Sequence, residues 1–179
     1  MNNDIVQGFD SEKNETITLT LRTIPDLDGG LVVSAAGYVD TYNVEFFRKQ
    51  LVKAVDAGFP RIVIEMDDVS QVSSAGMGAF TFLLRLTRSR NGDLVLNGIQ
   101  PRVHAIFQLL GFSRFFAFTE KLEESTARLS QSALARTFPM TFRCPVCGSR
   151  RKASKAGRFR CGECRTILVI DKATTVRLG

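Results

Sequence analysis

The chain has 179 residues, of which 44% are hydrophobic and 23% charged, and its formal net charge is +6. This length accommodates one domain of ordinary size and a small appendage, and the composition excludes a disordered tail. No apolar run approaches the roughly 18 residues of a membrane helix, and the start MNNDIVQGFDSEKNE lacks the basic and apolar regions of a secretory signal. We therefore expect a cytoplasmic protein that does not insert into a membrane.

The first half of the chain predicts a hairpin followed by a helix. Residues 1–15 are polar and without periodicity, which predicts a flexible leader. TITLTL (16–21) alternates threonine with apolar residues, as a half-buried strand does, and LVVSAAG (31–37) is the returning strand. From Asn43, a suitable N-cap, to about Ala57, apolar residues recur at steps of three and four, which predicts an amphipathic helix.

The second half alternates strands and helices. RIVIEM (61–66) is typical of a buried central strand, and the polar segment DDVSQVSS after it predicts a loop. The elements predicted next are a helix over 75–90, a strand within NGDLVLNG, a helix over 101–111, a short strand over 115–118 and a helix over 120–134. This order predicts an α/β fold, in which helices pack against a mixed β-sheet. Residues 135–141 predict a linker.

Three motifs within residues 16–134 resemble those of the STAS domain, the module of bacterial anti-sigma factor antagonists and of the cytoplasmic tails of sulfate transporters. Gly37-Tyr-Val-Asp40 is similar to the glycine-x-x-aspartate of the family, DDVSQVSSAGMG to its serine-containing loop, and Leu110-Gly111-Phe112 to the motif after its third helix. The resemblance implies a STAS-like mixed sheet. A transporter-associated role is a further possibility that no feature of the sequence favours.

In antagonists of this family, the serine after the aspartate of the loop accepts phosphate from a kinase that is also the anti-sigma factor. By position that serine is Ser74, while Ser73 replaces the aspartate and Ala75 the second hydroxyl residue. The resemblance therefore implies a non-enzymatic partner-switching protein in signal transduction and transcription regulation, controlled by phosphorylation of Ser74. It implies an anti-sigma factor/serine kinase as partner, together with a PP2C-type phosphatase. From the residues alone, a serine here is also a good helix N-cap.

The candidate partner-binding residues are Asp40, Asp68, Ser73, Ser74 and Gly76. The two aspartates could form an acidic rim that contacts a kinase or its magnesium, or could be turn residues bonded to their own backbone. No catalytic residue is predicted, because the GxSxG, GxxxxGK[ST] and HExxH signatures are absent from the sequence.

The four cysteines, Cys144, Cys147, Cys161 and Cys164, form two C-x2-C pairs separated by thirteen residues. This spacing fits the four thiolates of a structural zinc site, and glycines at 148 and 162 suit the tight turns that it needs. Disulfides and a redox pair are the alternatives: a cytoplasmic setting disfavours disulfides, and a redox pair would need its cysteines at the head of a helix in a βαβ context, which is missing here. Residues 142–179 thus resemble a small zinc ribbon, with a strand over 167–170.

The positive charge of the chain is concentrated in this ribbon. Residues 143–165 hold eight Lys or Arg against one acid, Glu163, so this window carries +7 and the rest of the chain −1. The candidate nucleic-acid contacts are Arg150, Arg151, Lys152, Lys155, Arg158, Phe159 and Arg160. Such a segment could bind phosphates while the ring stacks on a base, could dock on an acidic protein, or could only solvate the ribbon. Part of the positive charge could simply offset the thiolates. The alternative function is therefore a nucleic-acid or ribonucleoprotein binder that uses the STAS domain as a scaffold.

Overall fold

The computed structural model describes residues 5–9, 14–134, 139–170 and 176–179. Residues 1–4 and 10–13 of the predicted leader, and residues 135–138 of the predicted linker, lie outside these described residues. The chain divides into two compact units, Met1–Ser130 and Gln131–Gly179. No helix in the described part of the chain is both long enough and apolar enough to cross a membrane.

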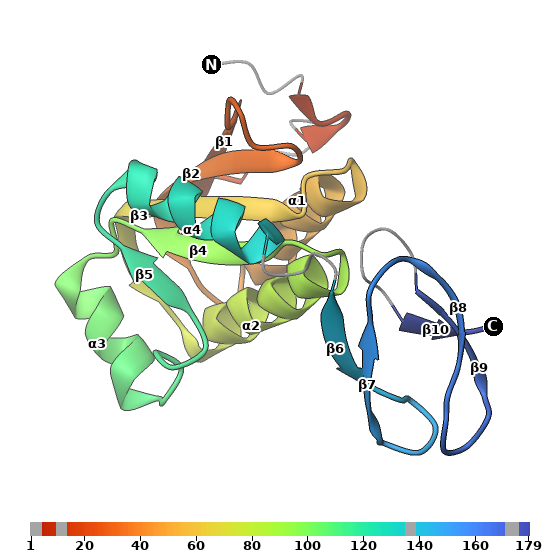
Figure 1. Cartoon of the computed structure of the whole chain (residues 1–179). Helices are drawn as coiled ribbons and strands as arrows, with labels where there is room; N and C mark the ends of the chain where they lie inside the picture. Colours follow the sequence, from red (N-terminus) through yellow and green to blue (C-terminus); the bar gives the residue numbers. More distant parts are fainter. Residues whose placement is uncertain (1–4, 10–13, 135–138, 171–175) are drawn as a thin grey trace. The chain divides into compact units, whose positions relative to one another are not determined.

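The first unit is a five-stranded sheet with helices on both faces, in strand order β1-β2-β3-β4-β5 (Figure 1). Strand β1 is antiparallel to β2, and the other neighbours are parallel. The predicted α/β class with a mixed sheet is therefore confirmed. The bounds are β1 (Ile17–Thr23), β2 (Gly30–Val39), α1 (Val44–Asp56), β3 (Arg61–Val72), α2 (Ser74–Ser89), β4 (Asp93–Asn97), α3 (Pro101–Leu109), β5 (Ala117–Thr119) and α4 (Leu122–Leu134).

Alternation along the strands divides the core between the two faces of the sheet. On one face, valines of β2, β3 and β4 pack against Leu129 of α4, which lies across the sheet in Figure 1. The other face packs against α1, α2 and α3, where the rings of Phe47 and Phe80 lie 5.1 Å apart and those of Phe80 and Phe107 lie 6.0 Å apart. This layered core fixes the strand ends from which the loops of the first unit emerge.

Strand β3 is longer than predicted, and the expected loop after Met66 is wrong. The strand continues to Val72 and pairs with β2 throughout, but with two register shifts that each place one extra residue in β3. As a result, Met66, Val69 and Val72 are buried at steps of three instead of two. Helix α2 therefore starts directly from the end of a strand.

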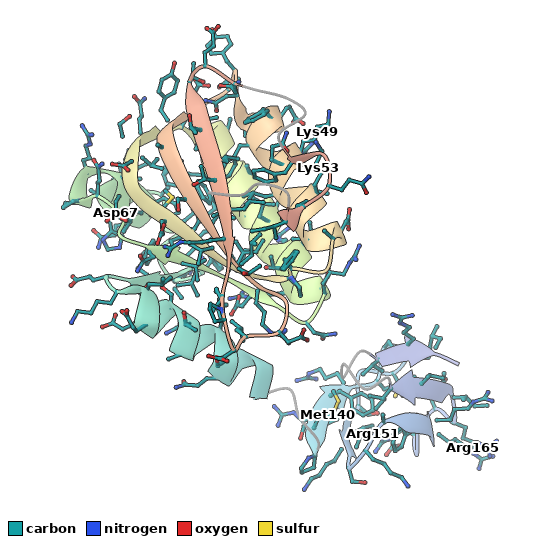
Figure 2. All side chains as sticks on the ribbon, turned by 90° about the horizontal axis from the view of Figure 1, so that it is seen from above. Lys49, Lys53, Asp67, Met140, Arg151 and Arg165 are labelled. Carbon is teal, nitrogen blue, oxygen red and sulfur yellow. The ribbon has the colours of Figure 1, made fainter. Side chains whose placement is uncertain are left out.

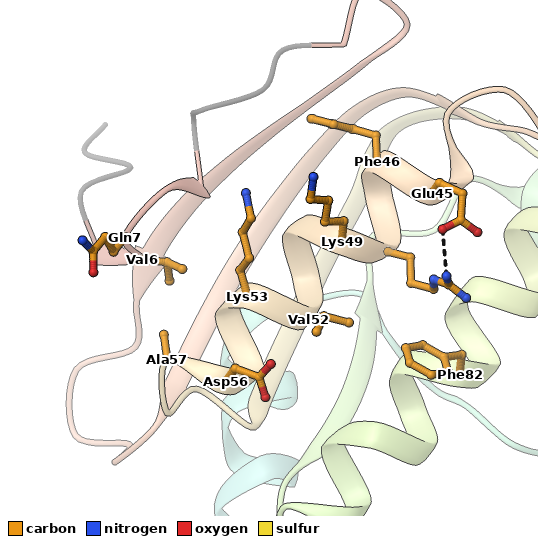
Figure 3. A pocket seen from close by; sticks show the side chains of 11 residues that line it. Val6, Gln7, Glu45, Phe46, Lys49, Val52, Lys53, Asp56, Ala57 and Phe82 are labelled. Atoms are coloured by element: carbon orange, nitrogen blue, oxygen red, sulfur yellow. Dashed lines mark hydrogen bonds and ion pairs between the residues drawn. The ribbon is translucent and has the colours of Figure 1, made fainter.

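The prediction of a flexible leader is also wrong for residues 5–9. Val6 and Phe9 are buried in the core of the first unit, each with 2% of its surface exposed. The ammonium group of Lys53 in α1 donates a hydrogen bond of 2.6 Å to the backbone carbonyl of Gly8. This segment and α1 border a hollow of about 910 Å³, shown in Figure 3.

The second unit consists mainly of two small antiparallel sheets. The hairpin of β6 (Met140–Arg143) and β7 (Arg150–Ala153) forms one, and β8 (Gly157–Arg160), β9 (Ile167–Ile170) and β10 (Val176–Leu178) form the other in the order β10-β9-β8. Among its described residues, the buried cluster consists of Cys144, Cys161 and Leu168, with a few partly buried neighbours. The predicted strand over 167–170 is confirmed, whereas the last two residues of the predicted linker, Met140 and Thr141, belong to β6.

Candidate functional site

The start of helix α2 is held against the end of β2. The backbone N–H of Ser73 donates to the carbonyl of Val39 at 2.9 Å, and the N–H of Met77 donates to the carbonyl of Ser73 at 2.9 Å. The side chain of Ser73 caps the helix, because its hydroxyl oxygen accepts the N–H of Gly76 at 3.2 Å. Of the two adjacent serines, Ser73 therefore has the structural role.

Ser74 is the first residue of α2, and it is exposed. Its hydroxyl makes no hydrogen bond with any residue that the structure describes. The backbone N–H groups of Ser74 and Ala75 likewise have no hydrogen-bond partner among the described residues, as is usual in a first helical turn. The arrangement leaves a hydroxyl group displayed at the positive end of a 16-residue helix.

Gly76 lies beneath this surface and has a packing role. A Cβ atom at Gly76 would lie 2.8 Å from the carbonyl oxygen of Val39 and 2.9 Å from a methyl group of Val72. Since Gly76 is buried, the structure does not present it to a partner as the sequence analysis expected. It is required for the close approach of α2 to β2.

Asp40 follows β2 directly and is half-buried. One oxygen of its carboxylate accepts the backbone N–H groups of Tyr42 at 2.8 Å and Asn43 at 3.1 Å, so the turn interpretation describes its contacts. Because Val39 contacts Ser73, this turn borders the start of α2. Tyr42, which the sequence analysis missed, is 94% exposed on the same turn.

Asn43 holds this turn in place. It occupies the N-cap position of α1, but its side chain makes no capping bond, contrary to the prediction. Instead its buried carboxamide accepts the N–H of Asp40 at 3.0 Å and donates to the hydroxyl of Thr16 and the carbonyl of Tyr38, both at 2.7 Å. In the sequence, only the preference of asparagine for N-cap positions indicated a role for this residue. That preference predicted hydrogen bonds to the first turn of α1, which the side chain does not form.

Asp68 is not grouped with Ser74. It is an exposed residue of β3, paired with Ala36, and not a turn residue. Val72 lies four positions further along the strand, which corresponds to roughly 13 Å. The structure thus places Ser73, Ser74 and Asp40 together, with Tyr42 as an addition, and leaves Asp68 apart.

The Ser74 surface is separate from the large hollow in Figure 3. That hollow is lined by residues of the 5–9 segment, of α1 and of α2, including Val6, Lys49 and Phe82, and by none of the five predicted partner-binding residues. Ser74 itself is exposed at the start of α2, where a second protein can reach it.

The four cysteine sulfurs of the second unit lie within 4.8 Å of one another. The Cys144–Cys164 and Cys147–Cys161 sulfur distances are both 3.7 Å. A disulfide requires about 2.05 Å, whereas four sulfurs placed tetrahedrally about 2.3 Å from a zinc ion are about 3.8 Å apart. The cluster therefore fits a tetrahedral metal ion and not a pair of disulfides.

Two equivalent turns present these sulfurs. The N–H of Gly148 donates to the carbonyl of Cys144, and the N–H of Arg165 donates to the carbonyl of Cys161, both at 2.9 Å. The residue after the second cysteine has positive φ in each turn, +71° at Gly148 and +58° at Arg165. The role predicted for Gly162 is therefore wrong, because the left-handed position falls on Arg165.

Hydrogen bonds favour the thiolate form of two of these cysteines. The backbone N–H of Cys164, followed by the guanidinium of Arg151, lowers the pKa of Cys161 to about 5. The hydroxyl and backbone of Ser149 lower the pKa of Cys147. Thiolates are the form that binds metal ions, so Cys161 is prepared for a cation at neutral pH.

Cys144 differs from these two. Hydrogen bonds from the backbone of Cys147 and Val146 act to lower its pKa, but burial and the sulfur atoms of Cys164 and Cys147 outweigh them, so that the pKa of Cys144 is raised. A cation between the four sulfurs would favour the deprotonated form here too.

Two of the seven predicted nucleic-acid contacts are not fully exposed. The guanidinium of Arg151, labelled in Figure 2, donates to the sulfur of Cys161 at 3.4 Å and pairs with Glu163 at 3.3 Å. Phe159 is paired across the sheet with the fully buried Leu168 and is itself only partly buried. The other five residues, Arg150, Lys152, Lys155, Arg158 and Arg160, are exposed.

A mixed sheet with helices on both faces defines the first unit as an α/β module. Comparison with known proteins gives its family. Residues 18–127 match the STAS domain, and residues 141–179 match a domain of unknown function, DUF8512. The chain belongs to the STAS domain family.

Relatives agree with this assignment. The chain is 30% identical over 105 residues to BtrV of Bordetella bronchiseptica, which is provisionally classed as an anti-sigma factor antagonist. The matched region covers 59% of this chain and 90% of BtrV. It is 26% identical over 96 residues to the anti-sigma-B factor antagonist of Bacillus subtilis, with 54% and 87% covered. The fold is similar to that of an anti-sigma factor antagonist from Mycobacterium paratuberculosis, with a TM-score of 0.54, 20% identity and coverage of 66% of this chain and 98% of that one.

Proposed function

We propose that this chain is a non-enzymatic, partner-switching regulator of the anti-sigma factor antagonist type. Its first unit binds an anti-sigma factor that is also a serine kinase, and phosphorylation of Ser74 ends that interaction. A PP2C-type phosphatase would restore the binding form. The similarity to anti-sigma factor antagonists supports the class of partner.

The observation that carries the proposal is the division of roles between the two serines. Ser73 caps α2, which leaves the hydroxyl of Ser74 exposed and without a hydrogen bond to any described residue. A kinase can therefore modify Ser74 without removing a contact on which the helix depends.

A phosphate on Ser74 is compatible with the fold but changes the surface. It adds a charge of about −2 beside the N–H groups of the first turn and the positive end of the helix dipole, both of which favour an anion. The same charge appears next to the turn that carries Asp40 and Tyr42. The modification therefore alters docking through charge and not through unfolding.

We further propose that Cys144, Cys147, Cys161 and Cys164 hold one structural Zn²⁺. The sulfur distances of 3.7 Å and the hydrogen bonds that favour thiolate at Cys161 support four-thiolate coordination. The ion supplies free energy of folding to a unit whose buried cluster is too small to be stable alone.

The switch can be tested with the purified chain and candidate anti-sigma factor/serine kinases from the same genome. Binding is measured by calorimetry, and the phosphorylated residue is mapped by mass spectrometry after incubation with ATP. We expect wild type to bind and to be phosphorylated at Ser74, Ser74→Ala to bind without being phosphorylated, and Ser74→Asp to bind at least about tenfold more weakly, a difference of about 1.4 kcal/mol.

Ser73→Ala is the matched control, because it removes the neighbouring hydroxyl and should keep both binding and phosphorylation. Phosphate found on Ser73, equal binding by Ser74→Asp and wild type, or no binding to any such kinase would each refute the proposal.

A further inference from the structure

The outer face of the β6–β7 hairpin is a basic surface that the proposed switch does not use. Exposure alternates along both strands, and the exposed positions are Thr141, Arg143, Arg150 and Lys152. One face of this hairpin thus consists of three cations and a hydroxyl group. Arg143 and Arg150, together with Thr141 and Phe142, also line a hollow of about 510 Å³.

The strand register brings like charges together on this face. Arg143 lies directly opposite Arg150, and Lys152 lies opposite Thr141. Directly opposed side chains are about 5 Å apart at Cβ, and like charges in such pairs are destabilising. Lys152 is two residues from Arg150, or about 7 Å along the strand. An uncompensated cluster of this kind favours a bound anion.

The described residues supply no counter-ion to these cations. Glu163, the single acid among residues 143–165, pairs with Arg151. The side chain of Arg143 donates one hydrogen bond, to the carbonyl of Gly148 at 3.3 Å, while the side chains of Arg150 and Lys152 form no hydrogen bond or ion pair with the part of the chain that the structure describes. The charge of this face is therefore available to a ligand.

Compensation of the thiolates does not explain this face. Arg151 contacts Cys161, and it alternates with Arg150 and Lys152 along β7, so its side chain lies on the opposite side of the strand. The inward cation thus has a structural role, while the outward cations are directed away from the cysteine cluster.

We propose that the outer face of the β6–β7 hairpin binds the phosphodiester backbone of nucleic acid. Guanidinium groups form bidentate hydrogen bonds with phosphate, and a hydroxyl such as that of Thr141 adds a further donor. The four exposed positions of the face include no apolar side chain of the kind that forms the centre of most protein interfaces, which disfavours an acidic protein as ligand. Since the exposed positions of the face are cations and one hydroxyl group, the contact is to phosphates and independent of base sequence.

The test uses the full chain and a fluorescein-labelled oligonucleotide, single-stranded and duplex, in anisotropy titrations between about 50 and 200 mM salt. We expect binding that weakens as salt rises. In the double variant Arg143→Gln/Arg150→Gln, binding should be weaker and the slope of log K against log salt should fall in magnitude by about 2, one for each lost phosphate contact.

The matched control is Arg85→Gln/Arg128→Gln, which removes the same charge from exposed helix positions of the first unit and should bind as wild type does. Lys152→Gln tests the same face by a milder change and should alter the slope of log K against log salt by about 1. The dispersion of amide signals in an NMR spectrum verifies that the second unit of each variant is folded. Absence of binding at low salt, equal weakening by the two double variants, or equally effective competition by polyglutamate would overturn the proposal.

Discussion

Replacing Ser73 by alanine removes the cap of α2 and leaves its neighbour untouched. The lost bond is the 3.2 Å hydrogen bond from the Gly76 N–H to the Ser73 hydroxyl. Loss of such a cap lowers the free energy of unfolding by about 1 kcal/mol. For a unit of about 130 residues this corresponds to a fall in Tm of about 4 °C.

Ser74→Ala provides the comparison. Since the Ser74 hydroxyl is exposed and has no described partner, we expect a change within about 0.5 kcal/mol, or about 2 °C. Thermal unfolding followed by far-UV circular dichroism measures both variants, because the described helices other than the end of α4 lie in the first unit. If Ser74→Ala lowers Tm as much as Ser73→Ala does, or if Ser73→Ala has no effect, the assignment of cap and acceptor is wrong.

Three further predictions concern the supports of the two units. Gly76→Ala should destabilise the first unit by about 1–3 kcal/mol in urea unfolding, because its new methyl group meets the Val39 carbonyl, whereas Gly78→Ala, with nothing within 4 Å, should stabilise α2 by up to about 1 kcal/mol. The packing argument fails if the two variants behave alike. Asn43→Ala should lower the free energy of unfolding by about 1–3 kcal/mol, since it leaves buried polar groups unpaired, and a change below about 0.5 kcal/mol would contradict the hydrogen bonds described. Removal of metal by a chelator, or Cys161→Ser, should abolish amide dispersion of the second unit while helical circular dichroism persists, and a folded metal-free second unit would count against a structural ion.

Periodicity in the sequence was sufficient to predict the main elements of the first unit. The alternation in TITLTL and the helical stripe from Asn43 to Ala57 correspond to β1 and α1, because each element buries one face against the same core. The spacing of the cysteines likewise predicted their convergence. These patterns depend only on residues close together in the sequence, and the corresponding elements are present in the structure.

The errors arose where burial depends on distant partners. The two extra residues in β3 change the spacing of buried positions from two to three, which removes the strand pattern from DDVSQV. Val6 and Phe9 are isolated apolar residues among polar ones, and only the completed core shows where they pack. Arg165 adopts a left-handed backbone conformation, which usually favours glycine. It does so because it occupies the same position in the second cysteine turn that Gly148 occupies in the first.

The attachment of the α2 start to Val39 has a consequence for any enzyme that modifies Ser74. The N–H of Ser73 is bonded to Val39, and Gly76 is packed against the same residue, so drawing the Ser74 hydroxyl out as an extended peptide would break both contacts. The modifying enzyme must accommodate an intact helix end in its active site. A short synthetic peptide covering this segment would accordingly be a poor substrate, and recognition would depend on tertiary structure more than on the flanking sequence.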